Sequence, residues 1–310
     1  MNHIDGNRIS SVAKYTDWVN MIEKAFLMEA NKDYYMPERN HIDYDGKTML
    51  LMPCFASKYF STKVITLTPG NRKQDIEPLQ GLVILNDSAT GKPLATLDAA
   101  SITAMRTAAV GSFAVRHLSP SDASRLGVIG LGIQGLHQAI FACSERNIKQ
   151  LYIYDRDEAT IKGFIERFQK TYPHLDIVTA RNSQEICENS EIIITATNSG
   201  APVLPDKEEL IRERTIIGIG SYKKNMREFP DCLYRLAGNI YVDSLHGLKE
   251  SGDLIVPVQK GLLKESDVIY ADQLLKNEST LKSTRVFKSV GTSLFDLMAS
   301  VLVYETLYMG

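Results

Sequence analysis

The sequence has little excess charge of either sign, and it lacks long apolar runs. Its 35 lysines and arginines nearly balance its 37 aspartates and glutamates, for a net charge of -2, so no basic surplus points to nucleic acid. No apolar run approaches the roughly 20 residues that cross a bilayer. The first residues, MNHIDGNRISS, lack the basic-then-apolar pattern of a signal peptide. We therefore expect a cytoplasmic protein with no nucleic-acid or membrane partner.

Cysteine is also scarce. The four cysteines lie far apart, form no CxxC pair and have no histidine at ligand spacing, which argues against a disulfide framework and a structural zinc site. The six histidines form no cluster, and no Ser/His/Asp or Cys/His spacing suggests nucleophilic catalysis. We expect no bound metal.

The middle of the chain alternates short β-branched runs with helical patterns. The length of 310 residues suggests two domains. Strands are predicted at residues 126–129, 151–154, 177–179, 191–195, 215–219, 240–242 and 268–270. Because helical patterns separate such strands, we predict an α/β domain with a doubly wound parallel sheet of the Rossmann type.

The first part of the chain has a different pattern. An amphipathic helix is predicted at Thr16–Ala30, and another helix at Ser101–Leu118. Between them, strands are predicted at residues 48–52, 62–68, 81–85 and 93–97. This is an α+β composition, and a polar stretch after Leu118 marks the boundary to the second domain.

A glycine-rich loop follows the first strand of the alternating region. Gly130, Gly132 and Gly135 form a GxGxxG motif between a predicted strand and a predicted helix. The first glycine allows a tight turn, the second lets the backbone approach a pyrophosphate, and the third lets helix and strand pack closely. We predict a dinucleotide site here, to which Ile133 and Gln134 also contribute.

The end of the next strand bears on the choice of cofactor. It ends at Asp155, twenty residues after Gly135, where an acidic side chain binds a ribose 2′-hydroxyl. This position favours NAD(H). The neighbouring Arg156 could accept a 2′-phosphate instead, so NADP(H) stays open.

Two cations stand where apolar side chains are expected. Arg106 lies in an otherwise apolar and small-residue helix, and Lys63 alternates with Ile65 on the presumed buried face of a strand. Each has a structural alternative, because Arg106 could pair with a structural carboxylate and Lys63 could snorkel at a strand start. Arg39 lies in a polar loop, with His41 close by in sequence. Such cations beside a nicotinamide would suit a small carboxylate substrate.

These residues, in this order, resemble the ornithine cyclodeaminase/μ-crystallin family over nearly the whole chain. The matching motifs are Pro37–Arg39, Met52–Pro53, Lys63 before the turn Thr68–Asn71, Asn86-Asp-x3-Gly-Lys-Pro, Ser101–Ala109, the GLGIQG loop, Glu250–Asp253 and Ser289–Gly291. The resemblance implies a homodimer. In it, residues 1–117 with 291–310 form the substrate-binding and dimerisation domain, and residues 118–290 form an inserted NAD(P)-binding Rossmann domain.

The resemblance also implies residue roles. Arg39, Lys63 and Arg106 match the cations that hold the α-carboxylate of the substrate, and we expect Lys63 to donate a proton near the substrate nitrogen. His41 and Tyr222 are further candidates for substrate contact. The additional cofactor contacts expected on this basis are Thr107, Thr197, Asn198, Ser221 and Gly291.

One departure from the family pattern bears on the reaction. Cyclodeaminases and archaeal alanine dehydrogenases carry an aspartate where this chain has Tyr222. Cyclodeamination needs a carboxylate, and a phenol with a pKa of about 10 is a poor base at neutral pH. Reduction of a preformed cyclic imine requires less, since the site must chiefly hold the carboxylate and direct a hydride. The loop Gly-Ser-Tyr-x-x-x-Met-Arg-Glu is similar to that of cyclic-imine (ketimine) reductases.

We therefore predict an NAD(P)H-dependent oxidoreductase that reduces small cyclic imino acids. Its substrates would be Δ1-pyrroline-2-carboxylate or Δ1-piperideine-2-carboxylate, and its products proline or pipecolate. The alternatives are an ornithine cyclodeaminase, a μ-crystallin-like protein that binds NAD(P) and an apolar ligand without turnover, and an opine-type or amino-acid dehydrogenase. The missing aspartate argues against the first and the intact cations against the second, whereas the third depends on pocket volume.

Overall fold

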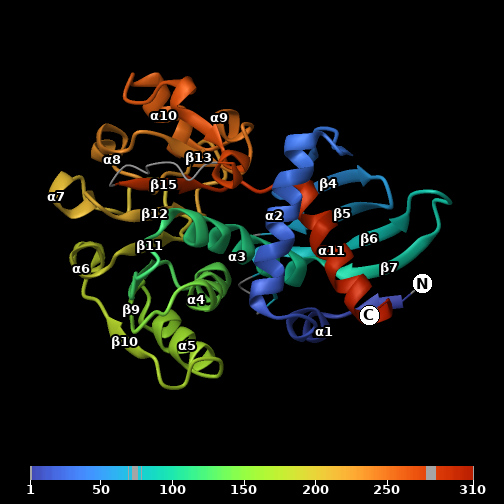
Figure 1. The fold of residues 1–310 in the computed structure, drawn as a ribbon, viewed down its shortest axis with the longest axis horizontal. Helices are drawn as coiled ribbons and strands as arrows, with labels where there is room; N and C mark the ends of the chain where they lie inside the picture. The colour runs from blue at the N-terminus through green and yellow to red at the C-terminus, as the bar shows by residue number, and fades with distance from the viewer. Residues whose placement is uncertain (1, 69, 72–75, 78, 277–283, 310) are drawn as a thin grey trace. The chain divides into compact units, whose positions relative to one another are not determined.

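A computed structural model describes residues 2–68, 70–71, 76–77, 79–276 and 284–309. The chain divides into two compact units. Unit 1 comprises Met1–Arg106 and Thr292–Gly310, and unit 2 comprises Thr107–Gly291. In Figure 1 unit 1 begins in blue and returns in red at the C-terminal end of the chain. Pro69, within the turn of the sequence motif, lies outside the described residues.

Unit 1 is built on a mostly antiparallel sheet. Its strand order is β1-β7-β6-β5-β4-β2, with β3 paired to β4. The pair of β1 with β7 is parallel, and the other pairs are antiparallel. In the described residues the strands are β1 (Asn2–Ile4), β2 (Tyr34–Tyr35), β3 (Asn40–Tyr44), β4 (Lys47–Ala56), β5 (Tyr59–Leu67), β6 (Leu79–Asp87) and β7 (Pro93–Asp98).

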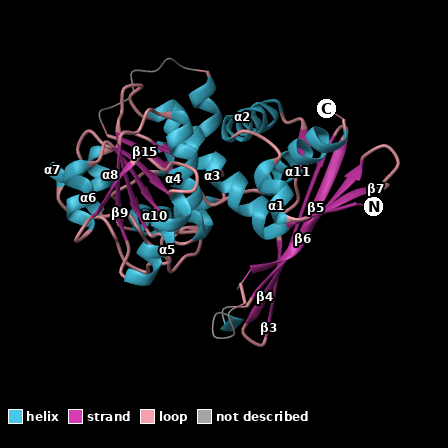
Figure 2. Ribbon diagram, turned by 90° about the horizontal axis from the view of Figure 1, so that it is seen from below, coloured by secondary structure: helices cyan, strands magenta, loops and turns pink. Residues whose placement is uncertain are grey.

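Helices cover one face of this sheet. Figure 2 shows α1 (Gly6–Ser11), α2 (Tyr15–Asn31) and α11 (Ser293–Tyr308) on the same side of the strands. Trp18, Ile22 and Phe26 recur every four residues along α2 and are fully buried, as the amphipathic pattern predicts. The ring of Phe26 meets that of Phe295 edge-on at 5.3 Å, so the returning C-terminal helix completes the core of unit 1.

Unit 2 contains a parallel sheet. Within the described residues its order is β10-β9-β8-β11-β12-β15-β13-β14, and every pair is parallel. The strands are β8 (Arg125–Ile129), β9 (Gln150–Tyr154), β10 (Asp176–Thr179), β11 (Ile192–Thr195), β12 (Thr215–Gly218), β13 (Ile240–Val242), β14 (Val268–Tyr270) and β15 (Arg285–Lys288). The chain order reverses between β8 and β11, which is where a doubly wound sheet binds its ligand.

Helices lie on both sides of the unit 2 strands (Figure 2). They are α4 (Ile133–Glu145), α5 (Glu158–Phe168), α6 (Ser183–Asn189), α7 (Glu208–Ile211), α8 (Asp231–Leu236), α9 (Gly247–Glu250) and α10 (Gly252–Gln259), with short 3-10 helices at Glu265–Asp267 and Ala271–Leu275. No helix of the described residues is long and apolar enough to cross a membrane. Nor do three or more His, Cys, Asp or Glu side chains of this part of the chain gather as metal ligands.

The predicted fold class, a Rossmann-type parallel sheet domain with a second α+β domain, is confirmed. The division of the chain falls inside α3 (Ala99–Leu118), between Arg106 and Thr107, whereas the sequence predicts a boundary after residue 117. The second half of α3 packs in unit 2, where the carbonyl oxygen of Thr107 accepts a hydrogen bond from Nε2 of Gln138 at 2.9 Å.

Candidate active site

Lys63 lies on the buried face of the unit 1 sheet. It is on β5, where alternate residues are buried, and it pairs with Met52 of β4 and Val83 of β6. Its side chain is fully covered, with only 1% of the residue exposed. The alternation therefore predicts its direction correctly, and the alternative of a lysine that snorkels to the surface is wrong.

A carboxylate outside the set of residues predicted from the sequence contacts this lysine. Asp296, on α11, places Oδ2 at 2.6 Å from Nζ of Lys63 and Oδ1 at 3.0 Å from Nε of Arg106. Asp296 is fully buried, and Arg106 is 7% exposed. Arg106 thus pairs with a buried carboxylate, which is the structural alternative that the sequence leaves open for it. The hydrogen bond to Asp296 is donated by Nε of Arg106, so it does not use either of the two Nη atoms.

Arg39 and Arg106 both act electrostatically on Lys63. Burial lowers the pKa of Lys63 from 10.5 to about 8, and Asp296 opposes this by favouring the ammonium form. Arg106 and Arg39 lower the pKa further because they are like charges. Lys63 and Arg106 thus contact one carboxylate, and Arg39 lies near enough to act on Lys63. We call these four residues the Asp296 cluster.

His41 takes another position. It is exposed on β3, where it pairs with Leu50 of β4. Arg39 directly precedes this strand and lies at the end nearer Met52, the partner of Lys63. His41 is therefore on the same hairpin as the cluster but farther along it.

The glycine-rich loop of unit 2 has the geometry that a pyrophosphate site requires. Gly130 has a φ of 90°, and a Cβ there would lie 2.6 Å from the carbonyl oxygen of Ala196. A Cβ on Gly132 would meet nothing within 4 Å, so this side of the loop is open. No side chain of the described residues caps the α4 N-terminus that follows, and Oε1 of Gln134 is buried without a hydrogen-bond partner. These features fit a dinucleotide phosphate.

Asp155 stands at the carboxyl end of β9, beside this loop. Its Oδ2 accepts a hydrogen bond from the backbone N–H of Leu131 at 2.8 Å, and its Oδ1 accepts one from that of Asp157 at 3.1 Å. A carboxylate has further lone pairs, so Asp155 can still accept from a ribose hydroxyl. The neighbouring Arg156 is exposed, as is Ile133 at 43%.

A second carboxylate organises the loops after β11 and β12. Oε1 of Glu228 accepts from the backbone N–H and the hydroxyl of Thr197, at 2.7 and 2.8 Å. Its Oε2 accepts from the N–H groups of Gly220 and Ser221, at 2.8 and 3.3 Å. Burial raises the pKa of Glu228, and Lys288 opposes this. The predicted cofactor residues Thr197 and Ser221 are thus held by one buried side chain, while Asn198 next to Thr197 is exposed.

A third carboxylate holds the loop that ends unit 2. Asp243, after β13, accepts from the hydroxyl of Ser289 at 2.6 Å and from the N–H groups of Val290 and Gly291, both at 2.9 Å. Gly291 has a φ of 79°, which favours glycine. Tyr222, the residue in place of the family aspartate, is 40% exposed, and Nζ of Lys223 lies 5.6 Å from its ring centroid.

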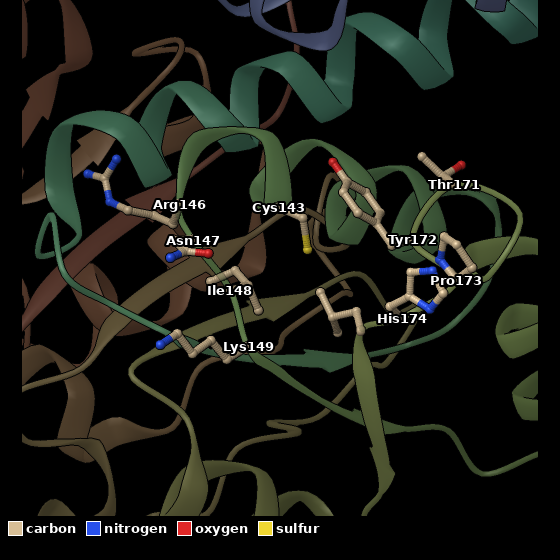
Figure 3. A pocket seen from close by; sticks show the side chains of 10 residues that line it. Cys143, Arg146, Asn147, Ile148, Lys149, Thr171, Tyr172, Pro173 and His174 are labelled. Carbon is tan, nitrogen blue, oxygen red and sulfur yellow. The ribbon is translucent and has the colours of Figure 1, made fainter.

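A cavity of about 520 Å³ lies elsewhere in unit 2. Figure 3 shows Cys143 and Tyr172 on its wall, with His174 beside Tyr172. Its lining residues precede β9 and β10, so it opens at the amino ends of the strands. Ligands of doubly wound sheets bind at the carboxyl ends, which separates this cavity from the glycine-rich loop.

Comparison with known proteins agrees with this geometry. The profile of the ornithine cyclodeaminase/mu-crystallin family matches residues 6–310. The chain belongs to this family. Within it, a Δ1-pyrroline-2-carboxylate reductase of Bacillus cereus is 35% identical over 272 residues, covering 84% of this chain and 82% of that protein.

Two solved structures of family members share the whole fold. A Δ1-pyrroline-2-carboxylate reductase of Thermococcus litoralis, in complex with NADH and L-proline, has a TM-score of 0.92 and 29% identity, covering 100% of this chain and 98% of that one. An archaeal alanine dehydrogenase dimer with bound NAD has a TM-score of 0.89 and 25% identity, covering 100% and 96%. The predicted family resemblance is confirmed.

Proposed function

We propose that the protein is an NAD(P)H-dependent reductase of small cyclic imino acids. It converts Δ1-pyrroline-2-carboxylate or Δ1-piperideine-2-carboxylate to proline or pipecolate. The observation that carries this proposal is the Asp296 cluster, in which Lys63 and Arg106 contact one carboxylate and Arg39 acts on Lys63 as a further positive charge. The surplus of positive charge in a largely buried site suits one small carboxylate ligand.

Each cation of the cluster has a separate role. Arg106 keeps its two Nη atoms for a bidentate contact with the substrate carboxylate, because its hydrogen bond to Asp296 uses Nε. Arg39 adds a second positive charge from the segment before β3. Together they would fix the orientation of a small ring, which is the main requirement of this reaction.

Lys63 supplies the proton. Reduction of the C=N bond adds a hydride to carbon and a proton to nitrogen. With a pKa of about 8, the Nζ of Lys63 is an ammonium at neutral pH and yet releases its proton more readily than an ordinary lysine. Its ion pair with Asp296 holds this proton donor in place.

Unit 2 carries the residues that would hold the dinucleotide. These are the glycine-rich motif with Gly130, Gly132, Ile133, Gln134 and Gly135, then Asp155 and Arg156, then Thr107 of α3, and the loop residues Thr197, Asn198, Ser221 and Gly291. When bound, the reduced nicotinamide supplies the hydride. Asp155 at the end of β9 favours NAD(H), although the exposed Arg156 leaves NADP(H) possible. On this assignment unit 1 binds substrate, with His41 as a further candidate contact, and Tyr222 is the candidate that belongs to unit 2.

The relatives support this substrate class. Those from Bacillus cereus and Thermococcus litoralis are both Δ1-pyrroline-2-carboxylate reductases, and the second holds NADH and L-proline. The combination of a carboxylate clamp, a proton donor and a dinucleotide loop is what such a reaction needs. Tyr222 in place of the family aspartate disfavours cyclodeamination, because it offers no carboxylate there.

The direct test uses purified protein with each cyclic imine and each reduced cofactor. Oxidation of NADH or NADPH should depend on the imine, and the product should be proline or pipecolate. If neither cofactor is oxidised at pH values on both sides of the Lys63 pKa of about 8, the reductase proposal fails. Ammonia release from ornithine without net cofactor change would favour a cyclodeaminase instead.

We also propose that two copies pair through the uncovered face of the unit 1 sheet. On this face, opposite Lys63, the register places Tyr35, Ile42, Met49, Phe55 and Leu82, which are 40–67% exposed. An apolar patch of this kind on a sheet is typical of an interface, and the archaeal alanine dehydrogenase relative is a dimer.

Introducing charged side chains on that face tests the dimer proposal. Replacing Phe55 and Leu82 together by glutamate should give monomers in sedimentation velocity. Leu27→Glu is the matched control, since Leu27 is 50% exposed on α2, outside the face. A doubly substituted protein that sediments like wild type would contradict this interface.

A further inference from the structure

Asp296 is an acidic side chain inside an apolar stretch of α11. Its neighbours Phe295 and Leu297 are fully buried, and Asp296 itself is 0% exposed. An isolated carboxylate in such a place would be costly, so the cations beside it compensate its charge. The pairing spans the chain, because Lys63 comes from β5 and Arg106 from α3.

The geometry goes beyond charge compensation. Each oxygen of Asp296 contacts one cation: Oδ2 forms an ion pair with Nζ of Lys63 at 2.6 Å, and Oδ1 accepts a hydrogen bond from Nε of Arg106 at 3.0 Å. A contact at Nε fixes the plane of the guanidinium while the Nη pair stays outside it. A contact at Nζ fixes the direction of the ammonium, which would otherwise rotate among several donors.

We propose that Asp296 is a positioning residue, which orients Arg106 for bidentate binding of the substrate carboxylate and holds Lys63 protonated and aimed at the substrate nitrogen. This inference rests on the proposed reductase function. Asp296 does not itself need to touch the substrate. Its effect reaches the reaction through two neighbours, so it should appear in two separable measurements.

The charged and titratable groups around Lys63 define the expected pH effect. They are Arg39 before β3, Arg106 on α3 and Asp296 on α11. Cys54 on β4, near Asp296 and Glu29, has a pKa raised to about 12 by burial and is therefore neutral. Asp296 is thus the main group that favours the ammonium form of Lys63, and its removal leaves burial and the like charges of Arg106 and Arg39 as the dominant influences, which disfavour that form.

The test compares Asp296→Asn with wild type in the full-length protein. The amide keeps the size of the side chain but removes its charge. We expect the basic limb of the kcat profile to move to lower pH by about one unit or more. We also expect KM for the imine to rise about tenfold, since Arg106 loses its fixed orientation. Ser300→Ala is the matched control, because its buried hydroxyl on α11 bonds only the backbone oxygen of Asp296.

A second variant separates charge from structure. Asp296→Glu keeps the charge and displaces it by one methylene, so it should retain the wild-type pH profile while KM rises. Thermal melting of each variant reports whether it is folded. If both variants give the same pH profile, or if Asp296→Asn changes stability alone, the positioning role is overturned.

Binding of pyrrole-2-carboxylate distinguishes this inference from the proposed reaction. Calorimetry with this planar carboxylate needs no turnover, so it remains informative if wild type reduces no imine. Weaker binding in Asp296→Asn than in Asp296→Glu supports the orientation of Arg106 even then. Equal affinity for wild type and Asp296→Asn refutes it.

Discussion

In unit 1 a single carboxylate, Asp296, faces cations from two other elements, whereas in unit 2 the carboxylates of Asp155, Glu228 and Asp243 accept hydrogen bonds from loop backbone. Lys63 and Arg106 carry more charge than the one carboxylate that they contact, which on the proposed function leaves positive charge for the substrate. In unit 2 the carboxylates tie the strand ends to one another: β8 with β9 through Asp155, β11 with β12 through Glu228, and β13 with β15 through Asp243. The same chemical group therefore prepares a charged clamp in one unit and a preformed backbone surface in the other.

The largest effect is expected from Arg106→Ala, which breaks the unit 1 arrangement. It removes the bidentate donor and leaves Asp296 with one partner, and losing one member of a buried pair costs about 3–5 kcal/mol. Reductase kcat/KM should fall about a hundredfold or more, and binding of pyrrole-2-carboxylate should be lost. Arg181→Ala is the control, because Arg181 forms an exposed ion pair with Glu185. Wild-type affinity in Arg106→Ala would remove the clamp.

Glu228→Gln should break the unit 2 arrangement with a smaller effect. The amide can accept on only one side, so one pair of hydrogen bonds, to Thr197 or to Gly220 and Ser221, is lost. We expect a loss of about 1–3 kcal/mol in the free energy of unfolding and weaker NADH binding in a fluorescence titration. Glu209→Gln, at an exposed position, is the control. Unchanged melting and NADH affinity would show that the two loops do not depend on this carboxylate.

The pH dependence sharpens the role of the unit 1 charges. The pKa of Lys63 is lowered to about 8, so the ammonium form prevails below that pH and is lost above it. Imine reduction needs the proton and should slow as pH rises through about 8, whereas oxidation of proline needs the free amine and should accelerate over the same range. In Lys63→Met the pH dependence of imine reduction and of proline oxidation should disappear, and most of the rate in each direction should be lost. If the rates of imine reduction and proline oxidation instead both rise or both fall with pH, the role of Lys63 as proton donor is contradicted.

The smallest effect concerns cofactor choice in unit 2. Asp155→Ser removes a negative charge beside the ribose site, so the ratio of kcat/KM for NADPH over NADH should rise by about tenfold. Asp176→Ser is the control, since Asp176 begins β10 at the amino ends of the strands, whereas Asp155 follows the carboxyl end of β9. An unchanged ratio would show that Asp155 does not contact the ribose and serves only to accept hydrogen bonds from the backbone of Leu131 and Asp157.

Much of the fold can be predicted because it is local. Apolar runs predict the strands β8 to β14 with ends shifted by no more than one residue. In contrast, β15 (Arg285–Lys288) has only two apolar residues between charged ends, and β3 (Asn40–Tyr44) is exposed along its length, so neither shows a pattern. Their places depend on pairing with distant strands.

The site is predictable where a residue violates its local pattern. Arg106 in an apolar helix and Lys63 on a buried face stand out for this reason, and both lie in the Asp296 cluster. The same test applied to the stretch LFDLMASVLV would have singled out Asp296. Glu228 gives no such signal, because it lies in a polar loop and its role depends on which backbone amides the fold brings to it.

The two-part construction of unit 1 has a consequence for synthesis on the ribosome. Arg106 and its counterion Asp296 are separated by 190 residues, and Lys63 lies earlier still. Unit 2, in contrast, is one continuous segment from Thr107 to Gly291. The emerging chain therefore holds every residue of unit 2 before α11 exists, and the N-terminal part must wait for its last helix. A chain that stops before Asp296 lacks the counterion of Lys63 and Arg106, so its N-terminal part cannot bury these two cations as the full chain does.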